Sequence, residues 1–273
     1  MTTALSDHDQ LFDLPSLPEQ ILDLADDFIV TGDLLEALSA TDDLPVSALR
    51  QQIPAAQTLV AQTLAVRECV ERTLRSAPAA VDASVRLRQT AYLAAGAADQ
   101  LFRALALADA GQDGAESRVG IAKDLTAHGA ETCVALAETI AVETLRRQVA
   151  QTGKDAPQLT SADLPAMRAV ARGKAHVTLM LGRQYITNDN GPRLGINTIR
   201  DLEARALIRR EGAPQGQEGQ QEGQQEGRPQ RLRLTAAGVR ALASSFGQAP
   251  TAGPSHQSSP SPARPPAPVK RSR

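Results

Sequence analysis

Apolar side chains recur every three or four positions along residues 17–150, which is the spacing of one face of an α-helix. The pattern begins near Pro18, where we expect a first helix with a kink or break at Thr31-Gly32. We expect the next long helix to start at Pro54, because proline is favoured in the first turn of a helix. Three or four helices of such lengths can bury a shared core, so an antiparallel bundle is the predicted architecture.

Two further helices are expected at residues 81–110 and 115–150, joined by a short glycine-containing turn. The first of them has an apolar stripe that we expect to face the core, made of Val81, Val85, Tyr92, Phe102 and Leu105. A wide apolar stripe can exceed what one copy of the chain covers. We therefore expect a homodimer formed through the helical domain.

After residue 162 the pattern changes from helical to mixed. Asp163 can cap a short helix, and residues that favour strands follow at 176–180 and 183–187. Asn190-Gly191 supplies a tight turn, after which residues 193–196 can return as a partner strand. The stretch before residue 197 is therefore predicted to contain a hairpin.

A helix, two strands and a last helix complete the predicted α+β segment. Asn197 and Thr198 can cap the helix that ends at Ala206, and Thr235 can cap the last helix. The two strands lie on either side of an insert that repeats Gln-Glu-Gly and has almost no apolar residue able to pack.

Two runs in this region resemble parts of a known family. The run N-T-I-R-D-L-E-A-R-A-L-I at 197–208 is similar to the recognition helix and following strand of winged-helix regulators, which commonly read T-[VI]-x-x-L-x-x-x-G-L-[VI]. The run L-T-A-A-G-V-R-A-L at 234–242 is similar to the L-T-x-x-G-x-x-x-L that follows the wing in MarR-like and PadR-like members. The resemblance covers about 80 of the 273 residues, from Ala166 to Phe246.

The chain departs from the family pattern at two places. Ala206 stands where the family usually has Gly, and a left-handed helix stop at alanine costs roughly 1 kcal/mol. The predicted hairpin stands where the family has its second helix. Both departures affect how the helix that ends at Ala206 would be presented to DNA.

These patterns predict a mainly α chain, with an N-terminal antiparallel helical bundle followed by a small α+β winged-helix module. The expected boundaries are a flexible N-terminus at 1–16, an acidic helical bundle at 17–150, a linker at 151–161, a winged-helix-like domain at 162–247 with a disordered low-complexity insert at 212–229, and a disordered basic tail at 248–273.

The net charge of −2 conceals a division between the two halves. Residues 1–160 carry 23 acidic and 12 basic side chains, whereas residues 161–273 carry 8 acidic and 17 basic ones. A basic module can neutralise phosphates and release their counterions, while an acidic one is repelled by them. The division favours different partners for the two halves, although solvated surfaces would have the same composition.

The resemblance implies that the C-terminal module contacts duplex DNA. Asn197, Thr198, Arg200 and Asp201 would then lie nearest to the bases of the major groove, with Arg205 farther along the helix. The implied DNA-binding residues are Arg193, Asn197, Thr198, Arg200, Asp201, Arg205, Arg209, Arg210, Arg231 and Arg233, of which the last four flank the wing and could grip phosphates or enter the minor groove.

The preferred interpretation is a transcriptional regulator whose helical domain dimerises or receives a signal. One alternative is a non-catalytic interaction or scaffold protein whose winged helix binds protein. Another is a plasmid or phage accessory factor that acts in partition or replication. The sequence does not separate the first interpretation from the last.

Motifs of enzymes and metal sites were sought without success. The chain has no P-loop, no G-x-G-x-x-G after a strand, no H-E-x-x-H and no C-x-x-C, so we expect no enzyme, no cofactor and no metal. Cys69 and Cys133 are far apart and are interpreted as small apolar core residues in a reducing compartment. Without a leader-like or membrane-spanning segment, a cytoplasmic protein with no membrane contact is expected.

Overall fold

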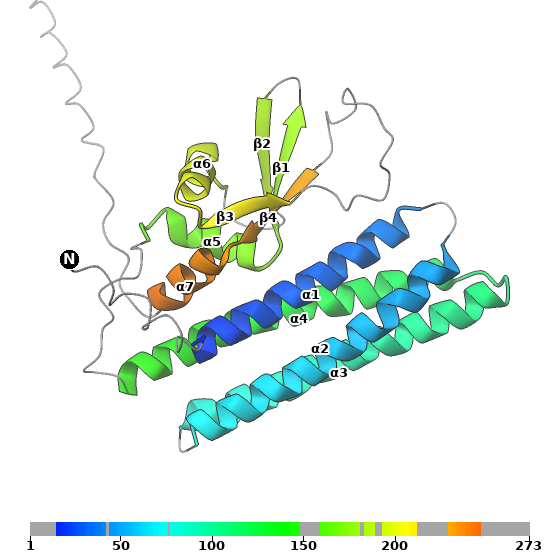
Figure 1. The fold of residues 1–273 in the computed structure, drawn as a ribbon, viewed down its shortest axis with the longest axis horizontal. Coiled ribbons are helices and arrows are strands. Elements are labelled where there is room, and N and C mark those ends of the chain that lie inside the picture. The colour runs from blue at the N-terminus through cyan, green and yellow to red at the C-terminus, as the bar shows by residue number, and fades with distance from the viewer. Residues whose placement is uncertain are drawn as a thin grey trace, which may run out of the picture.

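The computed structural model describes residues 15–41, 44–75, 77–147, 159–180, 183–188, 193–211 and 229–246. These residues form seven helices and one four-stranded antiparallel sheet (Figure 1). The helices are α1 (Leu17–Ser39), α2 (Val46–Thr73), α3 (Pro78–Asp109), α4 (Ala115–Arg147), α5 (Asp163–Ala171), α6 (Ile196–Ala204) and α7 (Ala236–Ser245). The strands are β1 (Ala175–Met180), β2 (Arg183–Asn188), β3 (Ile208–Glu211) and β4 (Pro229–Leu234). The predictions of a mainly helical chain and of a small sheet near its C-terminal end are confirmed.

The four N-terminal helices, α1–α4, pack side by side, with α4 lying against both α1 and α3 and α2 lying against α3 and α1 (Figure 1). Helix α1 begins with a capping box, in which the Ser16 amide donates to the Glu19 carboxylate at 2.6 Å. The helix continues through Thr31-Gly32, so the expected kink or break was wrong. A Cβ at Gly32 would lie 3.1 Å from Oγ1 of Thr126, so this glycine lets α1 and α4 approach closely.

Helix α2 begins before the proline that was expected to start it. It starts at Val46 and runs through Pro54. Leu49 and Ile53 are buried against the other helices. Their burial extends the helix toward its N-terminus, which outweighs the hydrogen bond that Pro54 cannot make.

Helix α3 buries the opposite face from the one expected. Its buried residues are Ala80, Ala83, Leu87, Thr90, Ala91, Ala94, Ala97, Ala98, Leu101 and Ala104. The expected core residues Val81, Val85, Tyr92 and Phe102 are all exposed, and Leu105 is half-buried. Alanines allow helix backbones to pack closely, and this close packing places the larger apolar side chains outside.

The C-terminal module, residues 159–246, places three helices around a sheet with the strand order β2-β1-β4-β3. Strands β1 and β2 pair as a hairpin in which Val177 lies opposite Ile186. The predicted hairpin before α6 is therefore present, but its strands are β1 and β2. The return strand expected at 193–196 was wrong, because Ile196 is already the first residue of α6.

The two sequence motifs meet where α6 ends and α7 begins. Ala206 has a φ of +54°, and the amide of Leu207 donates to the carbonyl of Leu202 at 2.9 Å, as in a Schellman helix stop. Thr235 caps α7 by accepting from the amide of Gly238 at 3.1 Å. A Cβ at Gly238 would lie 2.0 Å from the carbonyl oxygen of Leu207, so only glycine fits there. The threonine cap is confirmed, and the helix has the left-handed stop of the family pattern at Ala206 despite its cost for alanine.

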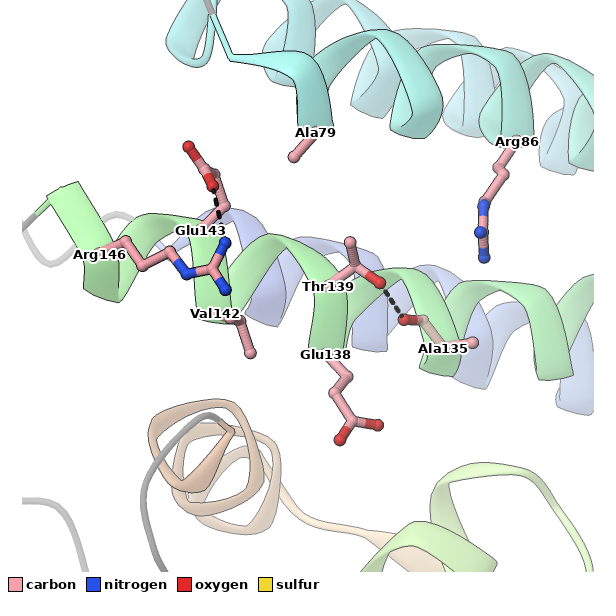
Figure 2. Close-up of a pocket in the computed structure, with 8 residues that line it drawn as sticks. All are labelled: Ala79, Arg86, Ala135, Glu138, Thr139, Val142, Glu143 and Arg146. Carbon is pink, nitrogen blue, oxygen red and sulfur yellow. Dashed lines mark hydrogen bonds and ion pairs between the residues drawn. The ribbon is translucent and has the colours of Figure 1, made fainter.

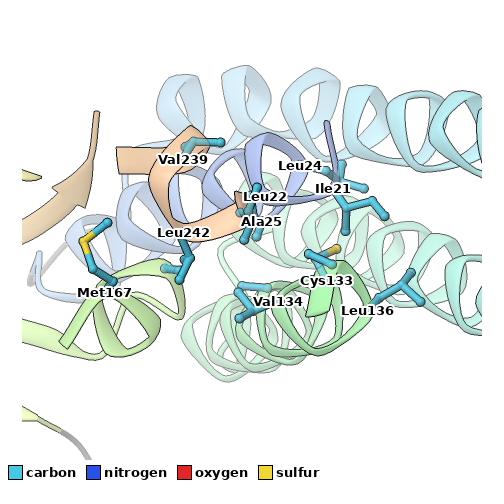
Figure 3. Packing of buried hydrophobic residues seen from close by; sticks show 14 of the residues in the cluster. Ile21, Leu22, Leu24, Ala25, Cys133, Val134, Leu136, Met167, Val239 and Leu242 are labelled. Carbon is cyan, nitrogen blue, oxygen red and sulfur yellow. The ribbon is translucent and has the colours of Figure 1, made fainter. Parts of the chain in front are cut away.

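One hydrophobic core runs from the N-terminal helices into the C-terminal module. Met167 of α5 and Leu242 of α7 are buried in the same cluster as Leu22 of α1 and Val134 of α4 (Figure 3). Leu159, from the expected linker, is buried there as well. Residues 1–14 of the expected flexible N-terminus at 1–16 lie outside the described residues, as do residues 212–228 of the insert expected at 212–229 and the whole tail expected at 248–273.

Candidate nucleic-acid interface

Helix α6 has one buried and one exposed side. Ile199 and Leu202 are fully buried beneath it. Asn197, Arg200 and Asp201 are exposed, and the last two follow Asn197 by three and four positions. This spacing puts the three side chains on one side of the helix, which therefore offers an amide, a guanidinium and a carboxylate to solvent.

The surroundings of this exposed side come from three segments. Gly195, and neither Asn197 nor Thr198, occupies the N-cap position, so the expected side-chain caps were wrong. Thr198 is half-buried. Nη2 of Arg200 donates to Oε1 of Gln184 at 3.3 Å, which links α6 to the β1–β2 hairpin. Arg193 is exposed just before the helix.

Two of the expected DNA-binding arginines instead connect elements inside the module. Nη2 of Arg205 lies 2.8 Å from Oδ2 of Asp163, a buried carboxylate at the start of α5. Arg210 of β3 binds Glu203 of α6, with Nη2 2.9 Å from Oε2, and this hydrogen bond raises the pKa of Arg210. Arg209 differs, because its side chain is 62% exposed and its pairing with Glu211 is loose, at 3.7 Å.

The arginines of β4 face helix α1 and contact its carboxylates. Arg231 lies 2.8 Å from Asp33 and 3.2 Å from Glu36, and it also donates to the Gly173 carbonyl at 2.9 Å. Arg233 lies 2.8 Å from Asp26 and 2.8 Å from Asp33. Glu211 is the third carboxylate that Arg233 contacts. We call these six residues the α1–β4 ion-pair cluster: Arg231, Arg233, Asp26, Asp33, Glu36 and Glu211.

Arg233, at the centre of the cluster, is shielded from solvent, whereas the side chains of Asp26, Glu36 and Glu211 are 41%, 59% and 44% exposed. The side chain of Arg233 is only 4% exposed, and burial lowers its pKa, but Asp26, Asp33 and Glu211 raise it by more. Burial raises the pKa of Asp33 to about 6, against the opposite influence of Arg231 and Arg233. Arg233 thus stays charged, while Asp33 changes charge within an accessible pH range.

Sequence reasoning missed the acidic half of this cluster. Asp33 and Glu36 follow Asp26 by seven and ten positions, so the three carboxylates lie on one face of α1. That spacing was the available signal. It indicated an acidic helix face but not its partner, which comes from the other end of the chain.

The exposed apolar side chains of the hairpin were not singled out from the sequence either. Leu179, Met180 and Tyr185 are 36%, 54% and 50% exposed. Tyr185 lies opposite Thr178 in the register of β1 and β2. An exposed aromatic ring next to exposed apolar side chains can stack on a nucleobase or pack on a protein surface.

The chain matches no family model, no curated protein and no solved structure. The geometry of the described residues is therefore what any functional argument must use. Within those residues there is no group of three or more His, Cys, Asp or Glu side chains placed to hold a metal ion. No helix in the described ranges combines the length and the apolar character that crossing a bilayer requires.

Two hollows lie away from α6. One, of about 440 Å³, is an open groove between α3 and α4 (Figure 2). Its polar groups do not converge, because Arg146 pairs with Glu143 along α4 and Glu138 points away from α3 to bind Arg168. The other, of about 280 Å³, lies beside the ion-pair cluster, where Asp33, Glu36 and Arg231 form part of its wall.

Proposed function

We propose that the chain binds duplex DNA through the C-terminal module and acts in the regulation of transcription. In this proposal the module is a variant winged helix, in which the β1–β2 hairpin occupies the place of the family's second helix. Helix α6 would enter the major groove, and the strands β3 and β4 would flank the wing. The same contacts would serve the partition or replication of plasmid or phage DNA, so DNA binding itself is what must be tested first.

The observation that carries the proposal is the exposed side of α6. Asn197 and Arg200 have the side chains that read adenine and guanine edges in pairs of hydrogen bonds. Both are exposed on one side of a helix whose other side is anchored by Ile199 and Leu202. A rigid helix with this outer side is what readout of a major groove requires.

Exposed cations near α6 would supply the phosphate contacts. Arg193 precedes the helix and Arg209 follows it, and both are exposed. Phosphate contacts fix the register of a protein on DNA but carry no sequence information. Arg193 and Arg209 are therefore assigned to positioning, and Arg200 to base readout.

The proposed contact set is smaller than the one implied by the family resemblance. Arg231 and Arg233 are held by α1, and Arg205 and Arg210 are held by Asp163 and Glu203. Bringing any of these four to a phosphate would leave a carboxylate without its partner. We assign them to holding the fold together.

The test is binding of the full chain to mixed-sequence duplex DNA by fluorescence anisotropy across a salt series. The full chain is needed because the module shares its core with α1 and α4. Affinity should fall as salt rises, and replacing Arg193, Arg200 and Arg209 by alanine should make the logarithmic salt slope shallower by about 1 for each lost phosphate contact. No binding at about 50 mM salt would refute the proposal.

A matched control removes the same charge elsewhere. Arg50, Arg72 and Arg75 are exposed at α2 and the turn after it. Their replacement by alanine should leave affinity and salt slope unchanged. An equal loss of affinity in both triple variants would show that only net charge matters and would contradict a site at α6.

A second candidate function is protein binding through the hairpin, and the exposed Leu179, Met180 and Tyr185 favour it. In that case the double variant Met180→Glu/Tyr185→Glu would abolish capture of a protein partner, while the chain would not bind DNA at low salt. Binding to DNA that this variant weakens would instead place the hairpin beside the nucleic acid.

A further inference from the structure

Helix α3 has an uninterrupted exposed seam opposite its alanine-rich buried face. The seam consists of Val81, Val85, Arg88, Tyr92, Ala95, Asp99, Phe102 and Ala106, all of which are exposed. Successive members are separated alternately by four and three residues. This is the spacing at which two α-helices wind around each other in a coiled coil.

The seam exposes more apolar surface than scattered single residues would. Val81 and Tyr92 are each 69% exposed, and Val85 and Phe102 are each 49% exposed. Because they lie along one line and not at random, they mark a contact surface. The surface is accessible, because the C-terminal sheet and its helices lie on the other side of the N-terminal helices (Figure 1).

The seam is complementary to itself when it is reversed. A second α3, laid antiparallel with its centre at the Leu93–Ala94 peptide bond, brings Arg88 opposite Asp99 and Val85 opposite Phe102. The same register brings Tyr92 opposite Ala95. Opposite charges then meet, and each larger aromatic side chain meets a smaller one. Each contact occurs twice, because a two-fold axis repeats it.

We propose that the chain forms a two-fold symmetric homodimer through antiparallel pairing of the α3 seams. The seam from Val81 to Ala106 is about 38 Å long at about 1.5 Å per residue, which gives a continuous helical contact. Charge complementarity selects a second copy of this chain over an unrelated apolar helix. The proposal does not depend on DNA binding, since no residue of α6 or of the hairpin takes part.

Local ion pairs support the accessibility of the seam. Asp99 pairs with Arg103 at 3.0 Å, and Asp82 pairs with Arg86 at 2.9 Å, both within one turn of α3. Asp99 belongs to the seam, whereas Arg103, Asp82 and Arg86 lie beside it, and the apolar members of the seam stay exposed. Asp99 keeps a face toward solvent, with a side chain that is 52% exposed.

The experiment is analytical ultracentrifugation of the full chain over a concentration series. It compares the wild type with variants in which the charge of Arg88 or of Asp99 is reversed, or in which the two charges are exchanged. The wild-type chain should be a dimer at about 10 µM, and Arg88→Asp or Asp99→Arg should each weaken dimerisation at least about tenfold, because each places two like-charge contacts across the axis. The double variant Arg88→Asp/Asp99→Arg should dimerise again, with an affinity within a few-fold of the wild type.

A control places a charge on another exposed apolar residue. Val30 is 38% exposed and lies on α1, outside the α3 seam, so Val30→Glu should leave dimerisation unchanged. Circular dichroism should report the same helix content for all variants. A strict monomer, a dimer unaffected by the single reversals, or a charge exchange that fails to restore association would each overturn the proposal.

Discussion

The arginines of β4 and those around α6 belong to the same module, yet they lie in opposite surroundings. Arg233 is almost fully buried between carboxylates of α1 and β3, and Arg231 is held by Asp33 and Glu36. Arg200 and Arg193 are exposed. The sequence alone does not distinguish these four arginines, because all of them lie in the same basic segment. The comparison shows that positive charge in a segment indicates a phosphate site only where the fold leaves the charge unpaired.

The largest loss of stability should come from removing an arginine of β4. Arg233→Ala would leave Asp26 without its cationic partner and Asp33 with Arg231 alone, so the free energy of unfolding should fall by about 3 kcal/mol. Urea denaturation of the full chain, followed by circular dichroism, measures this loss. The variant Arg233→Lys should recover part of it, since lysine keeps the charge but not the planar fork.

If Arg233→Ala changed the free energy of unfolding no more than replacement of an exposed arginine does, the cluster would contribute nothing to folding. The β4 arginines would then become candidates for DNA contact again. The matched comparison is Arg209→Ala, whose loose pairing lies at the surface.

Titration of Asp33 tests the α1–β4 ion-pair cluster through one of its carboxylates. The pKa of Asp33 is raised from 3.8 to about 6 in the folded chain. Between about pH 3.8 and pH 6, Asp33 is therefore protonated in the folded chain but ionised in the unfolded chain. The contribution of Asp33 to stability therefore falls as pH rises through 6. Relative to Asp33→Asn, the wild type should gain about 1 kcal/mol of unfolding free energy between pH 7 and pH 5. Parallel stability curves for the two proteins would show that Asp33 titrates normally.

A smaller effect is expected at the end of α6, where no carboxylate is involved. Ala206 adopts a φ of +54°, which glycine adopts without strain. Ala206→Gly should raise the free energy of unfolding by up to about 1 kcal/mol, less the entropy that glycine adds to the unfolded chain. A thermal melt detects the shift, and a destabilised variant would mean that the alanine methyl group makes a packing contact that outweighs the strain.

The smallest change in stability should come from replacing an exposed arginine of α6. Arg200→Ala removes an exposed side chain with one hydrogen bond to Gln184, so unfolding should change by less than about 0.5 kcal/mol. If Arg200 reads bases as proposed, its replacement should instead lower DNA affinity and change sequence preference, which fluorescence anisotropy measures. A large loss of stability would move Arg200 into the same class as Arg233.

The sequence predicted what depends on neighbouring residues. The strand-favouring runs at 176–180 and 183–187 and the cap at Thr235 follow from local backbone preferences, and the structure has both. The return strand expected at 193–196 does not occur, and Ala206 is left-handed against the preference of alanine. The buried face of α3 did not follow, because alanines contribute little to an apolar pattern but permit the closest packing. Tyr92 and Phe102 dominated the pattern and lie outside.

The candidate site was predictable only in part for a different reason. The exposed side of α6 follows from helix periodicity once the helix is placed. The engagement of Arg231 and Arg233 does not, because their partners lie in α1 and no local pattern connects them. The ion pairs between β4 and α1 decide that Arg231 and Arg233 are engaged, and Asp163 and Glu203 do the same for Arg205 and Arg210.

The separation of the cluster along the chain affects the order of folding. Arg233 lies 207 residues after Asp26 and 200 after Asp33. During synthesis α1 leaves the ribosome early, and nearly the whole chain must be made before β4 can pair with its acidic face. A chain that stops before Pro229 would keep those carboxylates unneutralised and expose the core that α7 covers. Completion of β4 is thus the step that neutralises the acidic face of the first helix.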